Sequence, residues 1–285
     1  MIDIEHGRYW DLPWSLVSGC TPCSPGCDHC WSAGLSHHYR RSKRMGQDAP
    51  GVPVYTNDKG CFTGKIQTHP DRLSVPLKRR KPTVYSLWND WCHPDVTHHF
   101  RALAVKVASG CPRHTILALT KRPEIAADFW LRHEMGDKPP DNWWSGLTIC
   151  NQKEAFEKQS DFRKLPGRKF LSLEPLLSDI PFLMLADIDC VICGGETGPG
   201  ARPLHPDWVR SVRDQCQSVG VPFFFKGWGE YGPSPDAGLP DNLPSSAGYY
   251  FPAPYTPGKV WHFGRKAAGR LLDGRTHDDL AWRKG

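Results

Sequence analysis

The sequence predicts an α/β fold in which about six or seven parallel strands form a partial (βα) barrel. Two observations support this class. Short apolar β-like runs alternate with amphipathic, helix-like stretches along most of the 285 residues, a pattern typical of a parallel sheet with helices outside it. In addition, unusual polar residues recur just after the β-like runs, where the chemistry of barrel proteins is concentrated.

The expected elements follow from the hydrophobic pattern. Strands are predicted at residues 12–17, 83–87, 115–119, 143–149, 169–173, 190–193 and 222–226. Helices are predicted at 30–42, 94–109, 123–133, 152–165 and 206–219, with a short basic helix at 266–272. Pro206 near the first turn and Gly220 after the last give one of these helices clear ends.

We expect one domain covering residues 1–285, with irregular insertions at about 44–80 and 229–265. Both insertions are rich in Gly and Pro; the first is expected to wrap the barrel mouth and the second to form a lid or an edge covering. A chain of this length buries enough surface to fold without covalent cross-links. Domain size therefore gives no structural reason for its many cysteines.

Composition limits the cellular setting and the partners. The chain has 11 Cys, an odd number spread widely, which suits free thiols in a reducing compartment, here the cytoplasm. No apolar run reaches the roughly 18 residues of a membrane span, so no membrane partner is expected. The net charge of +6 permits an anionic partner such as DNA or RNA.

Four cysteines within eleven residues are the most informative feature: Cys20, Cys23, Cys27 and Cys30. The last three have the spacing C-x3-C-x2-C, followed by Trp31. Three thiolates can hold three irons of a [4Fe–4S] cluster and leave the fourth iron open to S-adenosylmethionine (SAM), whereas an electron-transfer cluster normally takes four cysteines. The spacing therefore predicts a radical SAM enzyme, and the barrel is expected to be of the radical SAM type.

Two other uses of these cysteines remain open at this stage, a zinc site and a disulfide framework. The only distant C-x2-C pair, Cys190 and Cys193, lies in an apolar strand-like run. Residues three apart on a strand point to opposite faces, so this pair is poorly suited to complete a zinc site. A disulfide framework would suit a secreted chain, but the N-terminus has no apolar signal-peptide segment.

Polar residues after the strands complete the predicted site. The candidates for binding SAM are Asn89, Asp90, Asn151, Glu174, Gly194, Gly195 and Glu196, and the candidates for contacting an anionic substrate are Lys121, Arg202 and Lys226. Structural roles compete with these assignments: Asp90 can cap a helix, and Glu174 can pair with Arg122 or Lys226. Lys121 and Arg122 can likewise form salt bridges to Glu174 or Glu196.

Several segments together resemble one family over nearly the whole chain. They are Gly19-Cys20-Thr21 with Ser24-Pro25-Gly26-Cys27-Asp28-His29-Cys30, then residues 119–123, 172–176, 194–203, 221–226 and 266–275. This set resembles the phage Gp37/Gp68 family, also called DUF5131, which is treated as radical-SAM-like. The resemblance implies a cluster spacing of C-x6-C-x2-C, which favours Cys20, Cys27 and Cys30 as ligands and leaves Cys23 as the alternative to Cys20.

The chain departs from that family at two points of the predicted barrel mouth. Cys150 stands where the family usually has Glu, and residues 88–91 stand where a Met-Ser-Asp-Leu-like stretch is usual. Both differences suggest a divergent substrate. The family's frequent occurrence in phages suggests nucleotide or DNA modification.

The sequence thus predicts an enzyme that cleaves SAM to a 5′-deoxyadenosyl radical, which abstracts hydrogen from an unidentified substrate, with nucleotides and nucleic acids as candidates. An external electron donor of the flavodoxin or ferredoxin type is implied. Two rival hypotheses remain. One is a non-catalytic nucleic-acid-binding protein stabilised by zinc or a cluster; the other is a DNA-lesion repair lyase on the same barrel.

Overall fold

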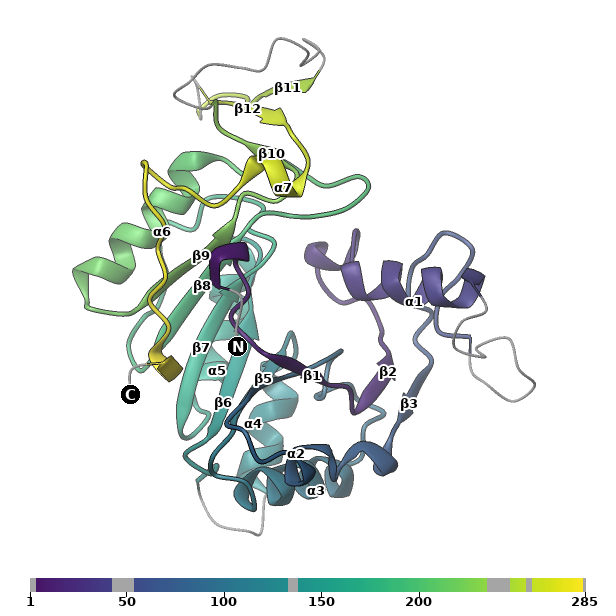
Figure 1. Cartoon of the computed structure of the whole chain (residues 1–285). Helices are drawn as coiled ribbons and strands as arrows, with labels where there is room; N and C mark the ends of the chain where they lie inside the picture. Colours follow the sequence, from purple (N-terminus) through teal and green to yellow (C-terminus); the bar gives the residue numbers. More distant parts are fainter. Residues whose placement is uncertain (1–3, 43–53, 133–137, 235–246, 255–257, 284–285) are drawn as a thin grey trace. The chain divides into compact units, whose positions relative to one another are not determined.

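The computed structural model describes residues 4–42, 54–132, 138–234, 247–254 and 258–283. Its main feature is a seven-stranded sheet in the order β1-β4-β5-β6-β7-β8-β9 (Figure 1). The strands are β1 (Leu12–Trp14), β4 (Val84–Leu87), β5 (Thr115–Thr120), β6 (Trp143–Thr148), β7 (Arg168–Leu173), β8 (Cys190–Gly194) and β9 (Phe223–Gly227). Pairing is parallel at β1–β4, β4–β5, β5–β6 and β8–β9. The order follows the chain without reversal, so the predicted partial (βα) barrel class is confirmed.

The helices match the predicted stretches with shifted ends, except for α2, which was not predicted. They are α1 (Trp31–Ser42), α2 (Val75–Lys78), α3 (His98–Ser109), α4 (Pro123–Leu131), α5 (Gln152–Arg163), α6 (Pro206–Ser218) and α7 (Arg265–Ala268). Helix α3 begins later than expected because Thr97 is its N-cap, with the side chain accepting from the Phe100 N–H at 3.2 Å. Helix α7 is shorter than expected because Gly269, at φ +67°, ends it.

The predicted first strand, 12–17, is wrong as a single element. It divides into β1 and β2 (Val17–Gly19), and β2 pairs antiparallel with β3 (Ile66–Thr68) in a separate two-stranded sheet. The chain bends between the two strands, where the Leu16 N–H donates to the Trp14 carbonyl at 3.0 Å. The cysteine loop therefore continues from β2 and not from a strand of the main sheet.

Both predicted insertions contain regular structure. Within 44–80, residues 44–53 lie outside the described part, and the remainder holds β3, a 3₁₀ turn (Pro70–Arg72) and α2. Within 229–265, residues 235–246 and 255–257 lie outside it; the rest forms an antiparallel sheet in the order β10-β12-β11. Its strands are β10 (Tyr231–Gly232), β11 (Gly248–Tyr250) and β12 (Lys259–His262). The expectation of a loop-like second insertion was wrong because aromatic and β-branched residues pair across these strands.

The chain forms two compact units. The first contains residues 1–3, 10–148 and 158–170, and the second contains 4–9, 149–157 and 171–285. In the first unit, the Trp91 ring packs edge-on against Phe129 and Trp143, at centroid distances of 5.6 and 5.1 Å. In the second, α6 lies beside β8 and β9 (Figure 1) and buries Val209, Val212 and Cys216. The single domain predicted from the sequence stays a prediction.

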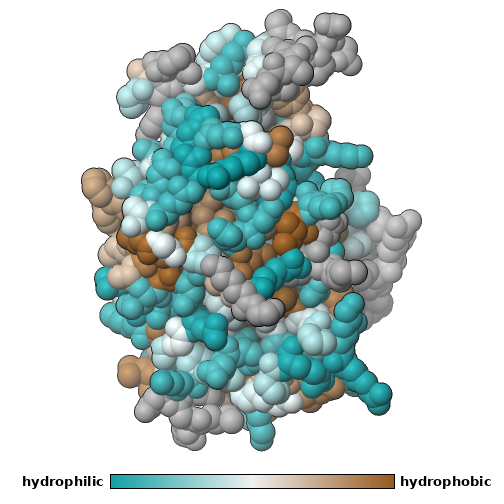
Figure 2. Space-filling view, turned by 60° about the vertical axis from the view of Figure 1, so that its left-hand side comes forward, coloured by the Kyte–Doolittle hydropathy of each residue, from teal (hydrophilic) through white to brown (hydrophobic). Residues whose placement is uncertain are grey.

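The mean hydropathy of the chain is −0.51. On the face shown in Figure 2, apolar side chains form separate patches within hydrophilic surface. Across the described residues, no helix combines the length and the apolar character that crossing a membrane requires.

Candidate functional site

The cysteine loop of the first unit is built from local turns. Ser24 caps a 3₁₀ turn (Pro25–Cys27), and its side chain accepts from the Gly26 N–H at 3.2 Å. The Gly64 N–H donates to the Cys20 carbonyl at 3.2 Å. Cys20 and Cys30 are half-buried, Cys23 is exposed, and all eleven cysteines are free thiols. At the other end of the loop, the Gly34 N–H donates to the Cys30 carbonyl at 3.0 Å, so both ends are anchored. The Cys20 thiol itself donates to the Thr21 carbonyl at 3.6 Å.

The thiols of the loop influence one another electrostatically. A hydrogen bond from Cys23 lowers the pKa of Cys27 to about 5, against the effect of burial and with help from the Lys121 ammonium, and the same bond raises the pKa of Cys23. Burial, and then the Asp90 carboxylate, raise the pKa of Cys20 to about 11. Cys27 is therefore largely a thiolate at neutral pH, and thiolate is the form that binds metals.

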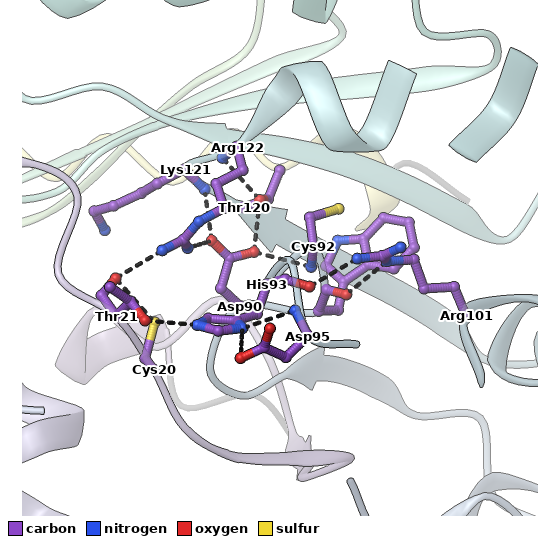
Figure 3. Close-up of polar contacts among 11 residues, drawn as sticks. Cys20, Thr21, Asp90, Cys92, His93, Asp95, Arg101, Thr120, Lys121 and Arg122 are labelled. Atoms are coloured by element: carbon purple, nitrogen blue, oxygen red, sulfur yellow. Dashed lines mark hydrogen bonds and ion pairs between the residues drawn. The ribbon is translucent and has the colours of Figure 1, made fainter. Parts of the chain in front are cut away.

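A buried ion pair lies beside the loop (Figure 3). Arg122 donates to Asp90 Oδ2 from Nη1 at 2.5 Å and to the Thr21 carbonyl from Nη2 at 2.7 Å. Asp90 follows β4 and Arg122 follows β5, so the pair ties the ends of two neighbouring strands to the residue after Cys20. Burial alone would lower the pKa of Arg122, but Asp90 and the thiols of Cys23 and Cys20 raise it.

Asp90 has its acceptor capacity used within the protein. Its Oδ1 accepts from the Thr120 hydroxyl at 2.6 Å and from the Cys92 N–H at 3.0 Å, and its Oδ2 also accepts from the Lys121 N–H at 3.3 Å. The residue is only 8% exposed. Charged groups this deeply buried require such a complete set of partners. The geometry gives Asp90 a positioning role, and its predicted contact with SAM stays a prediction.

His93 provides a second contact to Thr21. Its Nε2 lies 2.8 Å from Thr21 Oγ1, and its Nδ1 accepts from the Asp95 N–H at 3.2 Å. Because Nδ1 accepts, the neutral ring carries its proton on Nε2 and donates to Thr21. Burial, and then the Arg122 charge, lower the pKa of His93. Thr21 is thus held at both its carbonyl and its hydroxyl (Figure 3).

Asn89 connects the two flanks of the cysteine loop. Its amide nitrogen donates to the Val17 carbonyl at 2.7 Å, and its oxygen accepts from the Ser32 hydroxyl at 2.6 Å. Its φ of +60° lies in the left-handed region, which asparagine tolerates better than most residues. Asn89, predicted as a SAM ligand, therefore holds the strand before the loop to the helix after it.

The donor set suits a metal cluster. Four thiols on one anchored loop, with cationic Lys121 and Arg122 affecting their ionisation, are the chemistry that an iron–sulfur cluster or zinc uses. Within the described ranges, no three His, Cys, Asp or Glu side chains are already arranged around a common point. The residues fit the group by type and charge, and the side chains would have to converge when the group binds.

The other predicted residues lie in the second unit, where Glu196 and Arg202 are partners. Glu196 Oε1 accepts from Arg202 Nη2 at 2.6 Å, and its Oε2 accepts from Arg202 Nε and from the backbone N–H, both at 2.8 Å. Glu196 is 5% exposed. A residue predicted to bind cofactor and one predicted to bind substrate therefore close the loop after β8 through a bidentate pair.

Glu174 and Lys226 form the second pair. Their charged groups lie 2.7 Å apart, at Glu174 Oε2, whereas Glu174 Oε1 is buried with no hydrogen-bond partner among the described residues. Tyr9 lies nearby: burial, and then the Glu174 charge, raise its pKa. A Cβ on Gly194 would lie 3.3 Å from Lys226 Cβ, so the glycine accommodates this pair. One carboxylate oxygen here thus lacks a donor although it is shielded from solvent.

Asn151 and Gly195 have structural explanations. Asn151 Oδ1 accepts from the Glu154 N–H at 2.9 Å, as an N-cap residue of α5 does, and Glu154 Oε2 accepts from the Cys150 N–H at 2.7 Å, one residue before the cap. A Cβ on Gly195 would lie 2.0 Å from the Trp228 carbonyl oxygen. The space that the absent side chain leaves is therefore occupied by the backbone of Trp228 and not by a ligand.

Sequence reasoning missed Thr21, Thr120 and His93. Thr21 and Thr120 stand beside predicted site residues, and that adjacency was the available signal. His93 is separated from Thr21 by 72 positions, and nothing in the one-dimensional pattern pairs them. The missed residues share one function, which is to hold the loop rather than to contact a ligand.

Comparison with known proteins identifies the family of the chain. No curated protein matches the chain. No solved structure matches it. The family model described as "Protein of unknown function (DUF5131)" matches residues 5–281. The chain therefore belongs to the DUF5131 family.

Proposed function

We propose that this protein is a radical SAM enzyme acting on an unidentified substrate, with nucleotides and nucleic acids as candidates. The observation that carries the proposal is the anchored loop of four free thiols, tied through Thr21 to the ends of β4 and β5 by Arg122 and Asp90. In parallel βα folds the ends of the strands are where ligands and chemistry gather.

In this proposal Cys20, Cys27 and Cys30 hold a [4Fe–4S] cluster, with Cys23 as the alternative to Cys20. When bound, the cluster and SAM supply reductive cleavage of SAM to methionine and a 5′-deoxyadenosyl radical that abstracts hydrogen. The low pKa of Cys27 favours ligation, because the thiol does not have to lose a proton at neutral pH. Lys121 and Arg122 offset the negative charge of the thiolates.

The second unit has groups whose chemistry suits SAM and an anionic substrate. The free Oε1 of Glu174 is an acceptor suited to an ammonium group such as that of SAM. Lys226 is 44% exposed even though it pairs with Glu174, so its ammonium can also meet an anionic substrate. The ion pair of Arg202 and Glu196 would fix the conformation of the loop after β8. Asn151, Gly194 and Gly195 would help by fixing the backbone conformation of the loops after their strands.

The direct test is turnover of SAM. The protein is reconstituted anaerobically with iron and sulfide, reduced with dithionite and given SAM, and 5′-deoxyadenosine is quantified by chromatography. The proposal expects slow formation that requires both dithionite and SAM and is lost in Cys27→Ala. Absence of 5′-deoxyadenosine from a protein that carries a full cluster would overturn it.

A non-catalytic, zinc-stabilised protein is the competing function, because thiolates on one loop also suit zinc. Metal analysis of protein purified anaerobically separates the two. Stoichiometric zinc, with no iron uptake during reconstitution, would favour the competing function. Iron and sulfide near four of each per chain would favour the enzyme.

A further inference from the structure

The small sheet β10-β12-β11 in the second unit has two unlike faces. Strand β12 is central and pairs with β10 on one side and β11 on the other. Lys259 of β12 lies opposite Tyr250, and Trp261 of β12 lies between Gly232 of β10 and Gly248 of β11. Residues directly opposite each other in an antiparallel pair point to the same face, as do residues two apart. One face therefore carries Tyr250, Lys259 and Trp261.

The opposite face is used for packing. Tyr249 lies on it, and its ring contacts Phe251 at 5.0 Å between centroids. Phe251 is buried and contacts His205 and Trp208 at 4.6 and 5.4 Å. Phe251 thus attaches this face to the start of α6, although Tyr249 itself is 40% exposed. We call the other face, which carries the more exposed Tyr250, the outer face.

The outer face combines aromatic rings with positive charge. Lys259 Nζ lies 4.4 Å from the centroid of the Tyr250 ring and 3.7 Å from that of Trp261. Tyr250 is 68% exposed. Helix α7 adjoins this face, because a Cβ on Gly232 would lie 3.3 Å from Ala268 Cα, and it adds the exposed side chains of Arg265 and Lys266. We call Tyr250, Lys259, Arg265 and Lys266 the aromatic–basic face; Trp261, only 9% exposed, lies beneath Lys259 and supports it.

We propose that the aromatic–basic face binds single-stranded nucleic acid. An exposed tyrosine ring offers a surface on which an unpaired base can stack, and neighbouring cations neutralise the phosphates on either side of it. A duplex does not fit this chemistry because its bases are already stacked on one another. The space over Gly248 is filled by Lys259 and Trp261, whose atoms lie 2.9 and 3.1 Å from the position of a Cβ, so these two side chains are held against the sheet beside the exposed Tyr250 ring.

A purely structural role is the alternative. Cross-strand pairs of lysine and an aromatic ring stabilise exposed hairpins, by cation–π attraction and by contact with the lysine side chain. Such a pair has no need of Arg265 and Lys266 beside it, nor of a tyrosine left two-thirds exposed. The experiment therefore measures binding and folding separately.

The binding test does not depend on the cluster, so it is independent of the proposed enzymatic function. Fluorescein-labelled 12-nucleotide dT and rU strands, and a duplex of the same length, are titrated with full-length protein and followed by anisotropy. We expect the single strands to bind more tightly than the duplex. Tyr250→Ala should weaken binding about 10-fold, whereas Tyr250→Phe retains it because the ring remains.

Charge is tested with a matched pair of variants. Lys259→Gln should lower affinity and reduce the slope of log Kd against log salt by about 0.7, the value for one phosphate contact on a single strand. Lys153→Gln removes the same charge from an exposed position on α5 in the same unit and should leave the slope unchanged. Thermal melts of all four variants show whether the fold is intact.

Three results would overturn the proposal. They are no binding of either strand by the wild-type protein, unchanged affinity in folded Tyr250→Ala, and equal slopes for Lys259→Gln and wild type. Formation of 5′-deoxyadenosine in any of these cases leaves the enzymatic proposal standing. Conversely, binding by protein that takes up no cluster supports this inference alone.

Discussion

Arg122 is bonded to Asp90 at 2.5 Å and, through its other terminal nitrogen, to the Thr21 carbonyl at 2.7 Å. Both charged side chains are 8% exposed. The Arg122 guanidinium therefore bridges the Asp90 carboxylate and the Thr21 backbone carbonyl. It makes the geometry of the cysteine loop dependent on residues that follow two different strands.

Removing one partner of this pair should be costly. Arg122→Met leaves a buried, uncompensated Asp90 and should lower the free energy of unfolding by about 3–5 kcal/mol. Asp90→Asn combined with Arg122→Met should recover part of that loss, because the orphan charge is removed. Urea unfolding of the three proteins measures it. A loss below about 1 kcal/mol in Arg122→Met would contradict a buried, fully bonded pair.

Arg122→Lys separates charge from geometry. Lysine keeps the positive charge but cannot bond Asp90 and Thr21 simultaneously with a planar fork. We expect a folded protein that takes up iron and sulfide but loses the cluster faster on exposure to a chelator. If Arg122→Lys retained the cluster as long as the wild-type protein does, the positive charge at this position, and not the geometry of the guanidinium, would stabilise the cluster.

The identity of the third cysteine ligand gives a clear contrast. Cys20→Ala should abolish cluster binding, and Cys23→Ala should retain it, if the ligands are Cys20, Cys27 and Cys30. Iron and sulfide content after reconstitution measures this. The reverse result would assign the ligand to Cys23. Cys61→Ala, a half-buried cysteine outside the loop, serves as the control.

Stability should fall in mild acid, in part through His93. The pKa of His93 is lowered from 6.5 on folding, chiefly by burial, so the unfolded chain binds the proton more readily than the folded one. The stabilisation is therefore complete above about pH 6.5 and is lost as the pH falls below that value toward the folded pKa. His93→Gln can still donate to Thr21 but does not titrate. We expect the melting temperature of His93→Gln to fall less than that of the wild-type protein between about pH 7 and pH 5. The control His99→Gln, at an exposed site, should show the same fall as the wild-type protein.

The close packing around Gly195, directly after β8, predicts that adding one methyl group there lowers the stability of the protein strongly. Gly195→Ala would place its Cβ 2.0 Å from the Trp228 carbonyl oxygen, so the backbone must move. We expect a loss of more than about 2 kcal/mol in unfolding free energy. Gly34→Ala in α1 meets nothing within 4 Å and should stabilise by about 0.5–1 kcal/mol. Equal effects of the two changes would contradict the packing described for β8.

The fold class could be predicted because alternating β-like and helical segments determine strand order in a parallel sheet. The ends of α6 were predictable because Pro206 and Gly220 have local roles in helix termini. The first strand was not predictable in detail. Its division into β1 and β2 depends on pairing of β2 with β3, almost 50 residues later, and this long-range pairing leaves no local trace in residues 12–19.

The site was predictable by residue type more than by role. Asn89, Asp90 and Glu196 were chosen because polar groups at strand ends gather near ligands, and Arg202 was chosen as a cation for an anionic substrate. All four prove to bond groups of the protein itself. Sequence cannot distinguish a buried carboxylate that binds a ligand from one that binds an arginine, because both require polarity at the same position. Only the bonds to Thr21 reveal that Asp90 and Arg122 act on the cysteine loop.

The measurement that tests the central claim most directly is electron paramagnetic resonance of the reconstituted, dithionite-reduced protein before and after addition of SAM. The account predicts the signal of a reduced [4Fe–4S] cluster whose shape changes when SAM binds the open iron. It predicts the same change in Cys23→Ala and no cluster signal in Cys27→Ala. A reduced cluster whose signal ignores SAM, or a protein that assembles no cluster at all, would contradict it.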